Sequence, residues 1–97
     1  MRPAIEQLER LSPEDALRAI RTTMEILRER LIECYTRLWR GDDSCVADME
    51  RVKHALYLLI MADAQLEAAR RIGPEAYRSM VTLLRGSLED VVLALGQ

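Results

Sequence analysis

One seam of apolar residues constrains the fold of this chain more than any other feature of its sequence. From Leu17 to Leu38, apolar side chains recur at alternating spacings of three and four residues. The members of this seam are Leu17, Ile20, Met24, Leu27, Leu31, Cys34 and Leu38. Such a spacing keeps all of them on one side of a continuous α-helix. The pattern therefore predicts one long helix that buries a single face.

Start and stop signals bound this first helix. Ser12 is suited to cap its N-terminus, and Pro13 suits the first helical position. At the other end, Gly41 can adopt the left-handed conformation that often follows a helix. We therefore expect the helix to span residues 13–40, which gives a length of about 42 Å at 1.5 Å per residue.

Two more helices are expected downstream. The second, over residues 45–72, has an apolar face and further apolar residues around its middle, which predicts that it is enclosed on several sides. Asp42, Asp43 and Ser44 are three alternative caps for it, and the pattern does not choose among them. Gly73 and Pro74 end this helix and begin a third one over residues 74–95. Gly86, followed by a sequence that resembles a new cap, predicts a kink or a break in the third helix.

These elements predict an all-α fold in a single domain of 97 residues. The two long helices should form an antiparallel hairpin, with the broken third helix packed against it. Residues 1–12 form a short N-terminal segment, in which Ile5, Leu8 and Leu11 could make one or two helical turns. Because a chain of this size buries only roughly 60–65% of its unfolded surface, we expect it to pack as a dimeric helical bundle.

Composition and charge argue against nucleic acids and membranes as partners. The net charge is −2, and the arginines of the first helix alternate with Glu25, Glu29 and Glu33, so they form no continuous basic face. The longest nearly uninterrupted apolar run, residues 55–62, is far shorter than the ~20 residues that span a bilayer. The first ten residues lack the apolar core of a signal peptide. We therefore expect a cytoplasmic protein.

No residue pattern indicates catalysis, a metal or a cofactor. His54 is the single histidine, and its helical neighbours Glu50, Arg51, Tyr57 and Leu58 include no nucleophile. The paired Cys and His spacings of zinc and di-iron sites are missing, as is a glycine-rich phosphate loop. We therefore predict that the protein is not an enzyme and has no catalytic, metal-binding or cofactor-binding residues.

The two cysteines are expected to be reduced thiols. In a hairpin that turns near Gly41, Cys34 lies opposite a residue near position 50. Cys45 is then offset by about five residues, or ~8 Å at the helical rise, which exceeds the reach of a disulfide.

The apolar residues outside the seam point to a protein partner. Ile32, Tyr35 and Trp39 form a second stripe on the first helix, and Tyr57 and Met61 lie around the middle of the second. Either the third helix covers these residues, or they contact another protein, for which aromatic residues and Met are suited. We predict that these five bind a partner. The residues assigned to self-association in a homodimer are Leu17, Ile20, Met24, Leu27, Leu31 and Leu56.

Two long antiparallel helices, the Leu11-Ser-Pro-Glu-Asp15 cap and the Gly73-Pro74 stop resemble the small all-helical antiactivators of bacterial quorum sensing. TraM-like and QslA-like proteins are two branches of that class. The resemblance covers about residues 11–74 and rests on element lengths and caps, so it transfers no functional residue. It implies a cytoplasmic, dimeric, non-enzymatic protein that binds a LuxR-type transcriptional regulator and covers its dimerisation surface. A structural assembly subunit or a secretion-type helical chaperone is the alternative function.

Overall fold

The computed structural model describes residues 9–95 of the chain. These residues form three α-helices and no strand: α2 (Pro13–Trp39), α3 (Val46–Ile72) and α4 (Pro74–Ala94). This arrangement confirms the all-helical fold. Of the helical turns expected around Ile5, Leu8 and Leu11, the first two residues lie outside the described part of the chain. Glu9 and Arg10 are helical, and Leu11 lies in a bend before Ser12.

The N-terminus of α2 is capped as the sequence predicts. The Ser12 side chain accepts a hydrogen bond from the backbone N–H of Asp15, and Pro13 is the first helical residue. At the C-terminus, Gly41 has a positive φ of 92°, and the N–H of Asp42 donates to the carbonyl oxygen of Arg37. The chain thus folds back over the last turn of α2.

α3 begins one residue later than expected, and none of the three predicted caps is used. The residue before the helix is Cys45, whose side chain makes no capping hydrogen bond. Asp42 instead accepts a hydrogen bond from the N–H of Ser44 within the turn. The short polar side chain therefore stabilises the turn rather than the helix end.

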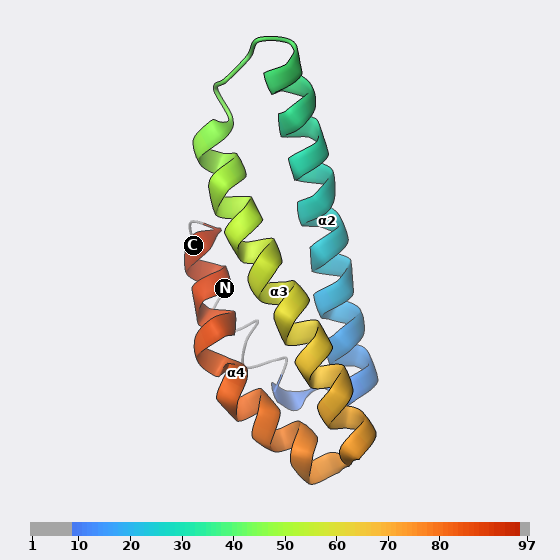
Figure 1. Cartoon of the computed structure of the whole chain (residues 1–97). Coiled ribbons are helices and arrows are strands. Elements are labelled where there is room, and N and C mark those ends of the chain that lie inside the picture. Colours follow the sequence, from blue (N-terminus) through green and yellow to red (C-terminus); the bar gives the residue numbers. More distant parts are fainter. Residues whose placement is uncertain (1–8, 96–97) are drawn as a thin grey trace.

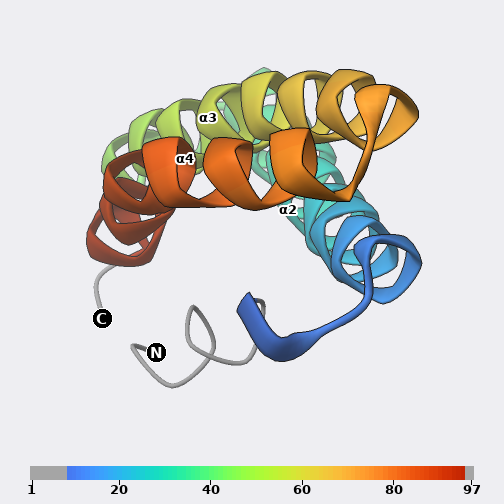
Figure 2. The ribbon, with the colours of Figure 1, turned by 90° about the horizontal axis from the view of Figure 1, so that it is seen from below.

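The helix α3 lies between the other two and packs against both of them. Figure 1 shows α2 and α3 as an antiparallel pair, with α4 running back along only the lower part of α3. Seen from below in Figure 2, α3 runs along the top, and α2 and α4 both lie beneath it. The molecule measures 50 × 23 × 17 Å along its principal axes, and its upper end consists of the α2–α3 hairpin alone.

The core lies where all three helices meet. Its buried members include Leu17, Ile20 and Leu27 from α2, and Met24 and Leu31 pack against them. From α3 and α4 the core takes Val52, Ala55, Leu56, Leu59, Ala62, Leu66, Tyr77, Leu84, Leu88 and Val91. Ala55 and Ala62 allow α3 to approach its neighbours closely. Most of the seam of the first helix is thus buried within one chain, whereas Leu38 near the end of the helix is exposed.

This burial removes the reason for assigning the seam to a homodimer interface. The residues assigned to self-association, Leu17, Ile20, Met24, Leu27, Leu31 and Leu56, all belong to the core or pack against it. A surface that joins two folded copies has to be exposed in each copy. The prediction assumed that one chain has more apolar surface than it can bury, but α3 covers these six residues within the chain.

The third helix is continuous in the structure. α4 runs through Gly86 without interruption, so the break expected there is not observed. The packing around residue 86 does not require a glycine, because a Cβ atom added at Gly86 would meet no other atom within 4 Å. Glycine weakens a helix by only about 1 kcal/mol, which packing of Leu84 and Leu88 into the core can offset.

None of the described helices is long and apolar enough to cross a membrane.

Candidate interaction surface at the hairpin tip

Large apolar side chains gather at the free end of the α2–α3 hairpin. Trp39, the last residue of α2, is 93% exposed, and Ile32 and Tyr35 are about half exposed. Leu38 and Val46, at the end of α2 and the start of α3, are also exposed. We call this group the tip cluster; its members are Ile32, Tyr35, Leu38, Trp39 and Val46.

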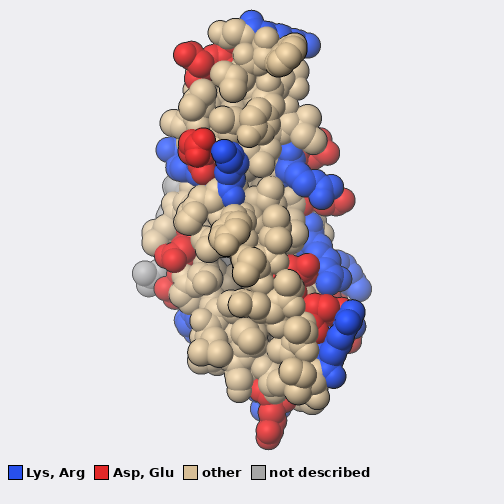
Figure 3. Space-filling model, in the orientation of Figure 1, with Lys and Arg blue, Asp and Glu red and all other residues tan. Residues whose placement is uncertain are grey.

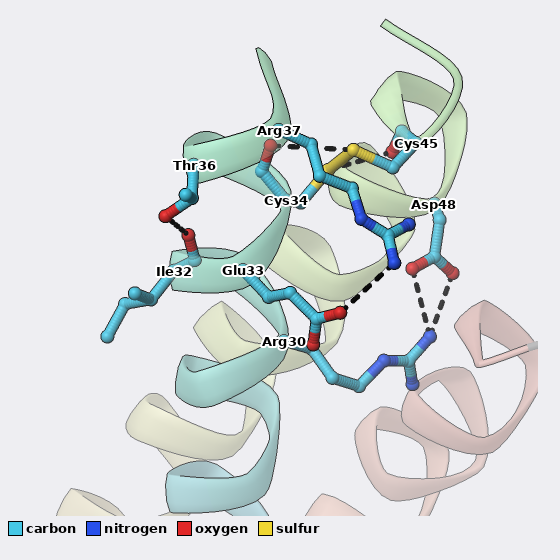
Figure 4. Close-up of polar contacts among 8 residues, drawn as sticks. All are labelled: Arg30, Ile32, Glu33, Cys34, Thr36, Arg37, Cys45 and Asp48. Atoms are coloured by element: carbon cyan, nitrogen blue, oxygen red, sulfur yellow. Dashed lines mark hydrogen bonds and ion pairs between the residues drawn. A yellow bond between two sulfur atoms is a disulfide. The ribbon is translucent and has the colours of Figure 1, made fainter. Parts of the chain in front are cut away.

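Ile32, Tyr35 and Trp39 of the tip cluster share one side of α2 by their helical spacing, and ion pairs lie on another side. Figure 4 shows Ile32 pointing away from Arg30, Glu33, Arg37 and Asp48. On this second side, Arg30 bridges to Asp48 of α3 at 2.8 Å, and Arg37 pairs with Glu33 at 3.1 Å. The tip therefore has an apolar side and a charged but balanced side.

A disulfide between Cys34 and Cys45 joins the two helices at the tip, which corrects the expectation of reduced thiols. The Cα atoms are 5.9 Å apart, well within disulfide range. The error came from applying the helical rise of 1.5 Å per residue to residues 40–45. These residues form turns and not a helix, so the helical rise does not apply to them, and the chain returns far enough to bring Cys45 level with Cys34.

The disulfide strengthens a part of the molecule with few other buried contacts. Cys34 is buried, as is Met49 of α3, but neither belongs to the core cluster. A crosslink at a sequence separation of 11 residues restricts the unfolded chain by about 3 kcal/mol in the chain-entropy account. The disulfide and the Arg30–Asp48 ion pair therefore hold together a hairpin end that α4 does not reach.

The structure exposes all five residues predicted to bind a partner but does not bring them together. Ile32, Tyr35 and Trp39 belong to the tip cluster, whereas Tyr57 and Met61 lie on the outer face of α3. Asp63, two residues beyond Met61, forms an ion pair with Arg21. Since Tyr35 follows Arg21 by fourteen residues on α2, Tyr35 and Met61 are about 20 Å apart along the hairpin.

Tyr57 and Met61 belong to a separate uncharged surface on α3. Ile60 and Ile72 are exposed there too, and Ala64 and Ala68 lie between them at helical spacing. In Figure 3, uncharged side chains fill much of the middle of the face that α3 presents in Figure 1, and many of the charged side chains lie toward its edges. The sequence pattern placed residues of two separate surfaces in one site. Helical spacing shows which side of a helix a residue occupies, but it does not show how far along the neighbouring helix its partners lie.

A cleft along α2 is lined by four arginines and two glutamates, and three of the arginines are paired with acidic side chains. It has a volume of about 560 Å³ and is lined by Glu14, Leu17, Arg18, Arg21, Thr22, Met24, Glu25, Arg28 and Arg70. Arg21 is paired with Asp63, and Arg70 with Glu14 and Glu67. The cleft therefore lacks the concentrated positive charge of a phosphate site.

Two polar side chains have perturbed acidities. Hydrogen bonds from the hydroxyl and the backbone N–H of Ser44 lower the pKa of the Asp42 carboxyl at the tip. Burial raises the pKa of the Tyr77 hydroxyl, which has no hydrogen-bond partner among the described residues. His54, the single histidine, is exposed on α3. Residues 9–95 contain no group of three or more His, Cys, Asp or Glu side chains placed to hold a metal ion.

No protein-family model matches the chain, and no characterised protein or solved structure matches it either.

Proposed function

We propose that the protein acts by binding another protein through the tip cluster. One observation carries this proposal: the largest apolar side chain of the protein, Trp39, is almost fully exposed beside Ile32 and Tyr35 at the free end of the hairpin. Exposed aromatic residues in an apolar group are the usual anchors of protein interfaces. The disulfide supports the proposal, because a braced surface loses less entropy when it binds.

The narrower form of the proposal concerns the partner. We propose a LuxR-type transcriptional regulator, with the chain as an antiactivator that covers the dimerisation surface of the regulator. A regulator held as a monomer contacts only one of two DNA half-sites and loses affinity. This form is supported by the resemblance in helix lengths and caps over residues 11–74. That the protein is a homodimer also stays a prediction. Two folded copies would have to join through an exposed surface, such as the face of α3 that carries Tyr57 and Met61.

Affinity capture with three forms of the purified protein tests the proposal. The first is the natural chain, and the second is the tip variant Ile32→Ser/Tyr35→Ser/Trp39→Ser. The third is a matched control, Leu83→Ser/Leu93→Ser, which removes exposed leucines from α4, 74% and 68% exposed. All substituted positions are exposed, so the three forms should melt at similar temperatures.

We expect a protein that is retained by the natural chain and the α4 control but lost with the tip variant. In the narrower form, a purified LuxR-type regulator should lose DNA binding in a band-shift assay when the natural chain or the α4 control is added, and keep it with the tip variant. Equal capture by the tip variant and the natural chain would contradict the proposed surface.

A further inference from the structure

The disulfide lies within the segment that carries the tip cluster. Cys34 is on α2 between Ile32 and Tyr35, and Cys45 directly precedes Val46, the first residue of α3. The bond therefore closes the stretch of chain that contains Tyr35, Leu38 and Trp39. Reduction of this bond therefore affects the tip cluster more directly than the rest of the protein.

The same disulfide is not needed by the three-helix core. The core cluster is built from residues of α2, α3 and α4 and does not include Cys34. α4 ends below the tip, as Figure 1 shows, so the core and the disulfide occupy different parts of the length of α3. Breaking the bond should loosen the tip and leave the core folded.

A reductant can reach the disulfide through a small cleft on the charged side of the tip. The cleft has a volume of about 140 Å³ and is lined by Arg30, Glu33, Cys34, Arg37, Cys45 and Asp48. Cys34 is 5% exposed, whereas Cys45 is only partly buried. The two arginines are paired with Asp48 and Glu33, so the walls are neutral overall and do not repel an anionic thiolate. Cys45 is thus the more exposed of the two cysteines.

We propose that Cys34 and Cys45 form a redox switch that sets the order of the tip cluster, with a protein dithiol of the thioredoxin type as its reductant. The thiolate of the reductant attacks Sγ of Cys45, forms a mixed disulfide and releases the Cys34 thiolate. The second thiol of the reductant then displaces the Cys45 thiolate and becomes oxidised to a disulfide. Two electrons pass to the chain, and the cysteines end as thiols with protons from the reductant and solvent.

The switch would regulate the surface assigned above, so its effect on partner binding rests on the proposed function. In the oxidised form the tip is closed and the cluster is ordered before it meets a partner. In the reduced form the two helix ends can separate, so binding has to order them again and becomes weaker.

Hydrogen exchange of the isolated protein tests the switch without a partner. The chain is treated with thioredoxin, its reductase and NADPH, and the thiols are counted. We expect complete reduction and exchange at residues 34–49 that is faster by about tenfold or more, while the core residues Leu59, Leu66 and Leu84 stay protected and exchange far more slowly than the tip. A disulfide that thioredoxin leaves intact, unchanged exchange at the tip, or a core that loses its protection together with the tip would each overturn the switch.

The variant Cys34→Ser/Cys45→Ser is the matched control, since it should exchange rapidly at the tip with or without the reductant. Slow exchange at its tip would also overturn the switch. Repeating the capture experiment with oxidised and reduced protein adds the functional consequence, for which we expect weaker capture after reduction. Capture independent of the tip cluster would refute the proposed function alone, whereas tip-dependent capture that is equal in both redox states would refute the switch.

Discussion

Cys34 and Cys45 are joined across the α2–α3 connection with their Cα atoms 5.9 Å apart, which fixes the end of the hairpin beside the exposed Trp39. The disulfide ties the last turns of α2 to the residue that precedes α3, at an end of the hairpin that α4 does not reach. It is therefore the main covalent constraint on the surface that we propose binds a partner.

Removing this disulfide should lower stability without changing the fold. For Cys34→Ser/Cys45→Ser we expect the free energy of unfolding to fall by about 3 kcal/mol, because the unfolded chain regains the freedom of the closed loop. Urea unfolding under non-reducing conditions measures the change, with far-UV circular dichroism as the check on helix content. A loss of most of the helical signal in the variant would contradict the separation of the tip from the core.

Tyr77 should make the protein sensitive to alkaline pH. Burial raises the pKa of this tyrosine above its ordinary value of 10.0, so the folded chain keeps a proton that the unfolded chain releases. The resulting contribution to stability is present below pH 10 and is lost as the pH rises through the folded pKa. We expect Tyr77→Phe to reduce the loss of stability above pH 10, as measured by urea unfolding across a pH series.

The same substitution should be tolerated at neutral pH. The Tyr77 hydroxyl is buried without a hydrogen-bond partner among the described residues, so removing it should leave stability unchanged or raise it by up to about 1 kcal/mol. Tyr57→Phe is the matched control, because Tyr57 is 61% exposed and should affect neither property. A clear destabilisation by Tyr77→Phe at pH 7 would show that the hydroxyl has a partner.

Leucines of the core and of the surface should differ strongly in their contributions. Leu66 is a buried core residue of α3, and Leu66→Ala should cost about 2–5 kcal/mol because it leaves a cavity. Leu83 is exposed on α4, and Leu83→Ala should change stability by less than about 0.5 kcal/mol. Chemical denaturation of both variants measures the difference. Similar values for the two would contradict the assignment of the core.

The cap of the first long helix can be tested in the same way. Ser12→Ala removes the side-chain acceptor for the N–H of Asp15 and should cost about 1 kcal/mol. Ser79→Ala is a control at an exposed position inside α4, where alanine should be neutral or stabilise by about 0.5 kcal/mol. Thermal unfolding measures both variants. We expect Ser12→Ala to lower the melting temperature and Ser79→Ala to leave it unchanged or raise it. Equal melting temperatures would argue against the cap.

Local signals in the sequence were sufficient for the helices and their ends. Ser12, Pro13, Gly41 and Pro74 act on neighbouring residues, so their effects can be read without knowing the rest of the fold. Gly86 predicted a kink or a break in the third helix, and the structure shows no break. Its local preference favours a break, but its helix is held by the core contacts of residues on either side.

Relationships between helices were harder to predict. The disulfide depends on how far the non-helical residues 40–45 travel, which no periodicity reports. The five residues predicted to bind a partner are exposed, but Tyr57 and Met61 lie far along the hairpin from Trp39. The position of Tyr57 and Met61 relative to Trp39 depends on how α2 and α3 are aligned. In the structure, the ion pairs Arg21–Asp63 and Arg30–Asp48 show this alignment.

The fluorescence of Trp39 gives the most direct test of the tip as a binding surface. Trp39 is the only tryptophan of the protein, so its emission and its quenching by acrylamide report on one known position. In the isolated protein we expect solvent-exposed emission and efficient quenching, because the side chain is 93% exposed. On addition of a captured, tryptophan-free partner or fragment, the emission should shift to the blue and quenching should fall several-fold. Unchanged emission and quenching while the partner is bound would contradict the central claim.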